Sequence, residues 1–449
     1  PKHMILGLLN TESTGLDRFG NFRRTVFYQY PNGSAPLTAI LSMLKSESTN
    51  DPEFTIYEKR FAEQRSTTAS ANSAGPFTAG GGGVDKTVGG FAVAVNDSIR
   101  IAIADSSPFR IGHIVQVTDV PNGAASAIQS LKLHLTGIVD ATHIEGRALE
   151  VYASVSNDTD ANSLEVLVIG NAAAEGQVGA ALAPYQPPIP LRNYTQIFRT
   201  PFQFTGTVLK TGLKYDVTGP YKDKAKDACY QHAEEIEKGY IFGTKTLYIN
   251  PVTGLPTRTT GGILWYLQQW ELATANPYGR SGASLDSDDD KRIITNTSGA
   301  FSLSQYNNYM ERLFRTTSNK ANEKLVLCGS GFLAAINDLF VGKSVLTLNQ
   351  EAKQKWGWDI VSHLTPFGTV HYRTHPLFSQ NGALRYSALF LDVWNLIYRY
   401  MDGRDTTLLK MRQPNNADYR EDEYFGEHGL ELRLPESFMF IKNFRTVTP

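Results

Sequence analysis

The sequence predicts an α+β fold in which a β-rich segment interrupts a body of mixed helices and strands. Between Phe91 and Ile169, short runs of β-branched and apolar residues are separated by turn signals such as Pro-Asn-Gly, a spacing typical of a small sandwich or barrel. From Asn193 onward, amphipathic helices and buried strands follow one another without the strand–helix–strand regularity of a parallel sheet. The chain of 449 residues is long enough for two or three domains.

The first 50 residues are predicted to form an arm followed by a short helix. Residues 1–30 have no sustained hydrophobic period, but they carry aromatic side chains that we interpret as docking points: Phe19, Phe22, Phe27, Tyr28 and Tyr30. A disordered leader is the alternative, although such leaders are usually poor in aromatic residues. After Ser34, a good N-cap, helical spacing predicts an amphipathic helix with the apolar positions Leu37, Ile40, Leu41 and Leu44.

Two segments before the β-rich region are predicted to be extended. Glu53 to Phe61 alternates apolar and polar residues and then becomes charged, as an exposed hairpin strand does. Ser66 to Gly83 is rich in Ser, Thr, Ala and Gly, which indicates a flexible connection.

A long helix is predicted from Pro220 to Phe242, between a strand-like run that begins at Asn193 and a strand–turn unit that ends on the sequence ILWYL. Its apolar positions are Tyr221, Ala225, Cys229, His232, Ile236 and Tyr240. Its outer positions are Asp223, Lys226, Asp227, Glu234, Glu237 and Lys238. Gly243 suits the end of the helix.

The C-terminal third is predicted to alternate helices and strands. Ser302 to Thr316 is a helix, followed by a buried strand around Cys328 and a second helix. The acid-rich run from Arg420 to Glu431 is interpreted as a turn that makes polar contacts with another subunit, and Gly429 to Ile441 as a final strand of the main sheet.

Composition excludes several functional classes. With 43 Lys and Arg against 44 Asp and Glu, the net charge of -1 gives no cationic excess to drive specific binding to nucleic acid. No apolar run approaches the roughly 20 residues that a membrane-spanning helix needs, so no membrane association is expected. The two cysteines, Cys229 and Cys328, have no partner at metal-ligand spacing and are interpreted as reduced core thiols.

Four short patterns could suggest ligand chemistry, but each departs from its motif. Gly80 to Thr87 approaches a phosphate-binding loop with Asp85 in place of a required glycine, so a loop tip is the better interpretation. The acidic run from Asp286 to Asp290 opens like a calcium loop but lacks its glycine and closing glutamate. His371 and His375 lack a third ligand for a metal. Trp356 and Trp358 could suggest a sugar-stacking platform, but we interpret them as ordinary loop packing.

A paired-carboxylate hydrolase is the remaining enzymatic alternative. The acids between Arg420 and Glu431 are consecutive, with nothing to separate an acid from a base. No nucleophile elbow and no Cys/His pairing is present either. We therefore predict no catalytic residue, no metal site and no cofactor.

An ordered set of motifs carries a family resemblance. NYTQIF begins at Asn193, TGT and KTG follow, the long helix ends in Phe-Gly, and RTTGGILW begins at Arg258. Two later runs belong to the set: YRYMDGRD from Tyr398 and EHGLELRLPESFMFI from Glu427. The order resembles the major capsid proteins of tailed bacteriophages and is most similar to the SU10-type family. The resemblance covers residues 193–444 and implies the HK97 fold, with an N-terminal arm, an extended loop, a peripheral domain and an axial domain.

The resemblance implies a division of the chain. Residues 1–50 would be the N-terminal arm and short helix, 51–84 and 171–200 the extended loop, and 85–170 an inserted β-domain. Residues 201–300 would be the peripheral domain with its spine helix at 220–242, 301–400 mainly the axial domain, and 401–449 a return to the peripheral domain. Inter-subunit contacts are expected in the arm and at Glu53, Phe54, Tyr57, Glu58, Lys59 and Arg60.

The implied function is self-assembly. The resemblance implies pentamers and hexamers of the chain that close into an icosahedral shell in the virion, assembled in the host cytoplasm around double-stranded DNA with which contact is non-specific. It also implies a portal, cement or decoration proteins, and a separate scaffolding protein if Pro1 merely follows a removed Met. The alternatives are an encapsulin-like, host-encoded compartment of the same fold, and an enzyme or glycan-binding protein. The large β-rich segment opposes the first, and the missing catalytic set opposes the second.

Overall fold

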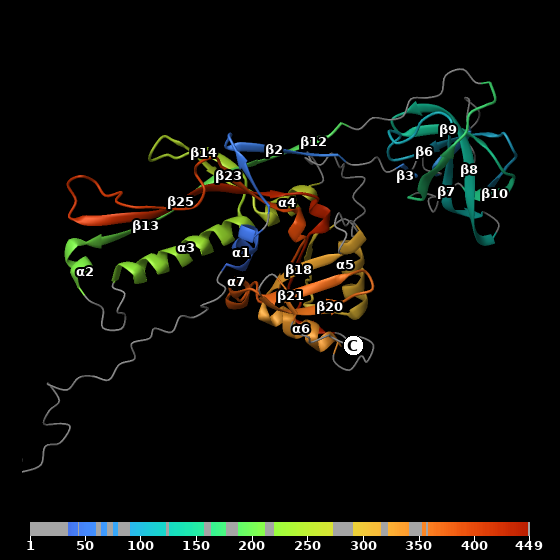
Figure 1. Ribbon diagram of the computed structural model, residues 1–449. Coiled ribbons are helices and arrows are strands. Elements are labelled where there is room, and N and C mark those ends of the chain that lie inside the picture. Colours follow the sequence, from blue (N-terminus) through green and yellow to red (C-terminus); the bar gives the residue numbers. More distant parts are fainter. Residues whose placement is uncertain are drawn as a thin grey trace, which may run out of the picture. The chain divides into compact units, whose positions relative to one another are not determined.

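A computed structural model describes residues 35–43, 45–59, 64–69, 75–79, 90–122, 125–156, 163–176, 187–211, 220–272, 291–315, 322–340, 353–355 and 358–447 (Figure 1). The chain divides into two compact units. The described residues of the first unit fall within 1–56, 191–272 and 287–449, and those of the second within 57–190.

The first unit is built on two larger sheets. One has the strand order β1-β23-β25-β13, with β24 also paired to β25. Its strands are β1 (Ser46–Thr49), β23 (Leu396–Met401), β25 (Tyr419–Leu432), β13 (Gln196–Thr205) and β24 (Thr407–Leu409). The other has the order β16-β26-β22-β18-β21-β20-β19. Its strands are β16 (Ile293–Thr295), β26 (Met439–Lys442), β22 (Ala388–Leu391), β18 (Glu323–Cys328), β21 (Thr369–Thr374), β20 (Trp358–Leu364) and β19 (Lys353–Lys355).

Shorter strands form three separate pairs. They are β2 (Glu53–Glu58) with β12 (Ile189–Tyr194), β14 (Thr246–Ile249) with β15 (Pro256–Thr259), and β17 (Ala300–Phe301) with β27 (Thr446–Val447).

Helices cover both faces of the sheet that contains β18. The α-helices are α1 (Pro36–Met43), α2 (Gly206–Lys210), α3 (Pro220–Phe242), α4 (Ile263–Trp270), α5 (Leu303–Arg315), α6 (Ser330–Phe340) and α7 (Pro376–Gln380). Two short 3-10 helices are η3 (Val393–Asn395) and η4 (Pro435–Ser437). Because side chains alternate along a strand, Leu325 and Leu327 enter the core formed with α1, α3, α4 and α7, whereas Val326 and Cys328 enter the core formed with α5 and α6.

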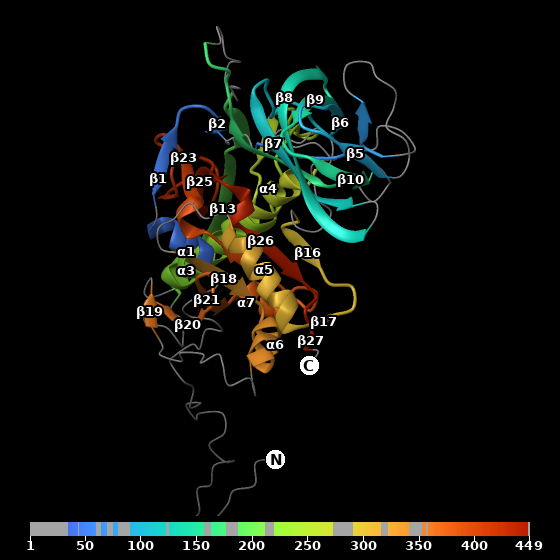
Figure 2. The ribbon, with the colours of Figure 1, turned by 90° about the vertical axis from the view of Figure 1, so that its right-hand side faces the viewer.

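The predicted long helix forms as α3 and lies along β13 and β25 (Figures 1 and 2). Apolar residues at alternate positions of β13 pack beneath it, among them Phe198, Phe202 and Phe204. This packing buries one face of the sheet, as expected for a strand that alternates buried and exposed residues.

The second unit is a small β structure with its own core. Its sheet has the order β3-β11-β7-β8-β9-β6-β4, and a bridge between Thr68 and Ile103 joins the chain beyond β3 to the chain beyond β6. The strands are β3 (Arg65–Thr67), β11 (Glu165–Asn171), β7 (His113–Asn122), β8 (Ala125–Asp140), β9 (His143–Ala148), β6 (Ser98–Ala102) and β4 (Phe77–Ala79), while β5 (Gly90–Val93) pairs with β10 (Tyr152–Ser156). The bridge leaves little open edge on which another chain could add a strand.

The sheet of the second unit extends beyond the predicted β-rich segment. Ser66 to Gly83 was expected to be a flexible connection, but its described parts contribute to β3 and β4. Their short runs of residues gain stability from pairing with β11 and β6, which local composition does not reveal. The domain boundaries at 85 and 170 stay a prediction.

Two strand expectations near α3 are wrong. The sequence ILWYL lies in α4, because Gly262 serves as the N-cap residue and Ile263, Tyr266, Leu267 and Trp270 then share one buried face. The TGT motif begins α2, because the side chain of Thr205 accepts a hydrogen bond from the backbone N–H of Val208.

Three C-terminal expectations also change. Arg420 to Glu431 is not a turn but part of the long strand β25, whose carboxylates are neutralised by arginines of the same chain. Gly429 to Ile441 is not one strand, because Leu434 adopts a left-handed conformation and η4 separates β25 from β26. The segment from Trp356 to Phe378, whose apolar residues predict strand throughout, ends in the helix α7, since Pro376 occupies its first turn and His375 caps it.

Two residues of α3 lie elsewhere than predicted. Cys229 is exposed rather than a core thiol, while Cys328 is buried as expected. Glu237, expected on the outer face, is fully buried. The hydrogen-bond donors that allow this burial come from elements distant in the sequence.

Candidate functional site

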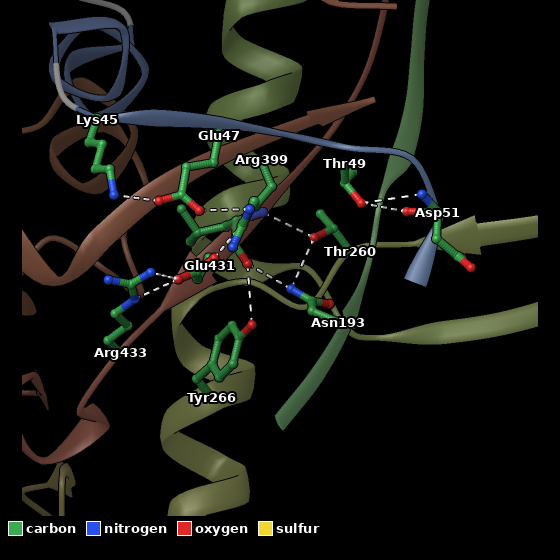
Figure 3. Close-up of polar contacts among 11 residues, drawn as sticks. Lys45, Glu47, Thr49, Asp51, Asn193, Thr260, Tyr266, Arg399, Glu431 and Arg433 are labelled. Atoms are coloured by element: carbon green, nitrogen blue, oxygen red, sulfur yellow. Dashed lines mark hydrogen bonds and ion pairs between the residues drawn. The ribbon is translucent and has the colours of Figure 1, made fainter. Parts of the chain in front are cut away.

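Four of the motifs that carry the family resemblance, those that begin at Asn193, Arg258, Tyr398 and Glu427, meet at one buried junction in the first unit (Figure 3). Asn193 is its centre. Its side-chain Nδ2 donates hydrogen bonds to the backbone oxygen of Leu430 at 2.8 Å and of Gly261 at 3.0 Å. Its Oδ1 accepts from the backbone N–H of Gly261 at 2.8 Å and of Tyr194 at 2.9 Å. One amide group therefore joins β12, β25 and the turn before α4.

The paired glycines of the motif allow backbone segments to approach one another at this junction. A Cβ atom on Gly262 would lie 2.6 Å from the backbone oxygen of Tyr240, and one on Gly243 would lie 2.3 Å from that of Gly239. Real side chains do not make such contacts. The motif thus needs glycine where the end of α3 meets the start of α4.

A buried carboxylate holds the outer strands of the same junction. Glu431, on β25, accepts hydrogen bonds from Arg399 on one side and from Arg433 on the other, the latter at 2.6 Å (Figure 3). Arg399 also reaches Glu47 of β1 at 2.8 Å. A hydrogen bond from Lys45, together with the charge of Arg399, lowers the pKa of Glu47. The ion pairs tie the edge strand β1 to the sheet.

The same pairing continues along β25. Arg199 on β13 makes two hydrogen bonds of 2.7 Å to the fully buried carboxylate of Glu423, which lowers the pKa of Glu423. Further along, Arg420 and Tyr221 hold Asp422, with the Tyr221 hydroxyl donating at 2.5 Å. These carboxylates are engaged by donors of the same chain, so they stabilise the sheet and are poorly suited to proton transfer.

Two neutral imidazoles lie between α3 and the sheet. His428 of β25 is stacked on Phe198 with 4.7 Å between ring centroids, and its Nδ1 lies 2.6 Å from the hydroxyl of Tyr240. Burial lowers the pKa of His428 to about 3, and electrostatic repulsion between the two rings, were both protonated, acts in the same direction. Burial also lowers the pKa of His232. Neither ring has a hydrogen-bond partner at Nε2.

The other predicted histidine pair is not brought together as a metal site. His371 contacts Ser362 at 2.9 Å, whereas His375 contacts Glu237 at 2.7 Å. In the described part of the chain, no three His, Cys, Asp or Glu side chains cluster as possible metal ligands. Within the same residues, no helix combines the length and the apolar character required to cross a bilayer.

The predicted inter-subunit residues fall into two groups. Five of them lie outside the described residues: Phe19, Phe22, Phe27, Tyr28 and Arg60. The two loop motifs, Gly80 to Thr87 and Asp286 to Asp290, also lie outside them. Among the others, Glu53 approaches Lys245 at 3.5 Å, and the ring of Phe54 is buried beneath the guanidinium of Arg399. Tyr57 is 69% exposed and Lys59 is exposed, while Glu58 is buried. Their contacts with other subunits stay a prediction.

Comparison with known proteins decides the family. The model of the SU10 major capsid protein family matches residues 20–445. The chain belongs to this family. A curated relative, the major capsid protein of Pseudomonas phage PaMx41, is 23% identical over 417 residues, which cover 92% of this chain and 86% of that protein.

Among solved structures, this capsid protein resembles a chain from the structure of Mycobacterium phage Adephagia, with a TM-score of 0.41, 7% identity and 99% coverage of each chain. It also resembles the holo-SrpI encapsulin complex of Synechococcus elongatus, with a TM-score of 0.37, 12% identity and coverage of 58% of this chain and 78% of that one. The assignment to a phage capsid family rests on the family match and the curated relative.

Sequence reasoning found the motifs but not what they do. Asn193 and the paired glycines were recognised by their order, whereas the roles of Glu237, Glu431 and His428 were missed. A fully buried carboxylate has no signature within its own helix or strand, because its partners are distant in sequence. The arginines at 399 and 433 were a possible signal, since carboxylates within a strand need cationic neighbours.

Proposed function

We propose that this chain builds the icosahedral shell of a tailed phage by assembling with copies of itself into pentamers and hexamers, and that it has no catalytic activity. The single observation that supports this most strongly is the match to the major capsid protein family over residues 20–445. Four of the motifs that carry the resemblance form a packed polar junction in which many donors and acceptors pair with one another.

The physical demands of a closed shell fit these features. A subunit must make several non-identical contacts around symmetry axes, and many modest contacts then give a stable lattice. The junction joins β12, β25, the end of α3 and the start of α4 through contacts within one subunit. The net charge of -1 suits a wall that encloses DNA without gripping phosphates.

The finer arrangement follows the family expectation. We infer the HK97-type division into N-terminal arm, extended loop, peripheral domain around α3 and axial domain around β18, with 57–190 containing an inserted β-domain. Assembly in the host cytoplasm, a portal, a separate scaffolding protein and cement or decoration proteins complete the proposal. Contact with packaged DNA is non-specific.

Electron microscopy of the 449-residue chain and of a variant that lacks residues 1–30 tests the proposal. The full-length chain should form closed, uniform shells, with scaffolding protein added where needed. The deletion variant should remain soluble and folded but fail to form uniform shells, because the arm supplies contacts between subunits. A full-length chain that stays a discrete monomer under all assembly conditions would contradict the function, and normal shells from the deletion variant would contradict the role of the arm.

A further inference from the structure

Among the described residues, helix α1 has no side-chain cap from its own segment. Its first residue, Pro36, has no N–H, and the N–H of Ala39 bonds to the carbonyl of Ala35 at 3.1 Å. The N–H groups of Leu37 and Thr38 lie in the first turn, where no earlier carbonyl can reach them. Ala35, at the capping position, has no side-chain acceptor. Ser34, predicted to be the cap, lies outside the described residues.

The missing cap is supplied by Glu237, 200 residues away on the spine helix α3. Its Oε1 accepts the N–H of Leu37 at 2.8 Å, and its Oε2 accepts both the N–H and the hydroxyl of Thr38 at 2.7 Å. A carboxylate at this position also meets the positive end of the helix dipole. Glu237 therefore replaces a local cap.

The same carboxylate reaches a third element. His375, which is fully buried before α7, donates from Nε2 to Oε1 of Glu237 at 2.7 Å. Its Nδ1 accepts the N–H of Leu377 at 3.1 Å, which leaves Nε2 as the donor. One side chain thus connects α1, α3 and the start of α7.

These contacts depend on one another. A buried carboxylate is tolerated only when donors replace water, and three of the four donors around Glu237 belong to α1. Leu37, Ile40 and Leu41 share a core with residues of α3, so polar and apolar contacts act at the same place. Undocking α1 would leave Glu237 with His375 alone among these donors. The position of α1 and the position of α3 are therefore coupled.

We propose that Glu237 is a positioning residue that couples the spine helix α3 to α1, and thereby sets the point from which the N-terminal segment leaves the subunit during shell assembly. The assembly role rests on the proposed function, whereas the coupling itself can be measured in unassembled protein. A displacement of α3 relative to the core would therefore move α1 with it.

The variant Glu237→Gln tests the coupling in the full chain. An amide has one donor nitrogen, so at least one N–H of α1 or His375 would face another N–H. The matched control is Glu234→Gln, one turn earlier on α3, where the side chain is 44% exposed and pairs with Lys238. In hydrogen-exchange measurements, amides of α1 should exchange roughly 10- to 100-fold faster in Glu237→Gln, and the control should match the wild type.

A second change separates capping from coupling. Ala35→Asp places a local cap before α1 and, combined with Glu237→Gln, should restore much of the exchange protection of α1. We expect Glu237→Gln to form irregular shells by electron microscopy. Because the new cap does not touch α3, the double variant should form irregular shells as well. If the double variant forms uniform shells, Glu237 acts only as a cap and the coupling is overturned.

The remaining outcomes separate this inference from the proposed function. Shells of Glu237→Gln that match the wild type, despite faster exchange in α1, would overturn the inference and leave the function standing. A wild-type chain that forms no shells would contradict the function, while the exchange data would still report the contact. Should Glu237→Gln not fold, Thr38→Val removes one donor alone, and unchanged exchange in its α1 would overturn the contact.

Discussion

The two halves of the long helix α3 are anchored differently. Its C-terminal half carries five of its six buried residues: His232, Ile236, Glu237, Tyr240 and Ile241. There it packs into the core shared with α1, α4 and the sheet around β18. In the N-terminal half only Ala228 is buried, in a small cluster with Phe202 and Phe204. The helix is held firmly at the motif end and lightly at the other.

This difference shows which end of α3 contributes most to the stability of the subunit and which end can open locally. The motif end combines close backbone contacts, a buried amide and a buried carboxylate, which fix a single geometry. The N-terminal half lies on a sheet surface through few apolar contacts, so it can open locally at low cost. Substitutions at the two ends should therefore differ in how much they lower the free energy of unfolding and in how many residues they affect.

The largest effect is expected where the end of α3 meets α4. In Gly262→Ala the new Cβ would lie within 2.9 Å of backbone atoms of Tyr240, Gly239 and Gly243, which cannot rotate away. We expect the free energy of unfolding to fall by about 3 to 5 kcal/mol in denaturant titrations. The control is Gly382→Ala, where a Cβ meets nothing within 4 Å. Equal stability of the two variants would show that the motif end is not rigid.

A pH effect is expected from the imidazole between the helix and the sheet. Burial lowers the pKa of His428 to about 3 from the ordinary value of 6.5. A depressed histidine pKa means that the unfolded chain binds the proton first, so this stability is fully present above pH 6.5 and is lost as the pH falls toward 3. By pH 4 the loss should be about 3 kcal/mol.

His428→Gln isolates this contribution. Glutamine keeps an acceptor for the hydroxyl of Tyr240 but does not titrate, so its stability should fall less steeply below pH 6.5 than that of the wild type. Above pH 7 the two curves should run parallel, which provides the internal control. Curves that stay parallel down to pH 4 would mean that His428 is not held neutral by the fold.

An intermediate effect is expected at the buried carboxylate of the sheet. Glu431→Gln removes the charge between Arg399 and Arg433 and leaves cationic donors around a neutral amide. We expect a loss of about 2 to 3 kcal/mol in the free energy of unfolding. Glu421→Gln is the matched control on the same strand, because Glu421 contacts Gln203 near the solvent. A loss no larger than that of the control would show that Glu431 does not stabilise the firmly held end.

The sequence predicted the elements whose signal is local. The period of apolar residues located α3 to its bounds, and the β-branched runs indicated the β-rich unit around Val115 and Leu133. It failed where a distant partner decides the outcome. The sequence predicts an outer position for Glu237 because its donors, in α1 and at His375, are distant in the chain. It predicts a turn for the acids of β25 because their partner Arg199 lies on another strand. Charge in a strand is stable only through such partners.

The same distinction applies to the candidate site. The order and spacing of the motifs at Asn193 and Gly261 indicated the family, but they did not predict that residues of the two motifs contact each other. The contacts predicted for the aromatic residues before Ser34 and for Tyr57 and Lys59 would lie between subunits, and the geometry of such surfaces is a property of an assembled shell.

The smallest effect is expected at the lightly held end of α3. Tyr221→Phe removes the hydroxyl that donates to Asp422 at 2.5 Å but keeps the ring beneath the guanidinium of Arg420. The free energy of unfolding should fall by about 1 kcal/mol, and hydrogen exchange should quicken only in the first three turns of the helix. Tyr230→Phe, on a more exposed ring of the same half, serves as the control. Faster exchange that extends through Ile236 and Tyr240 would mean that the two halves open together, and the helix would then be one cooperative unit rather than a firmly held end and a lightly held one.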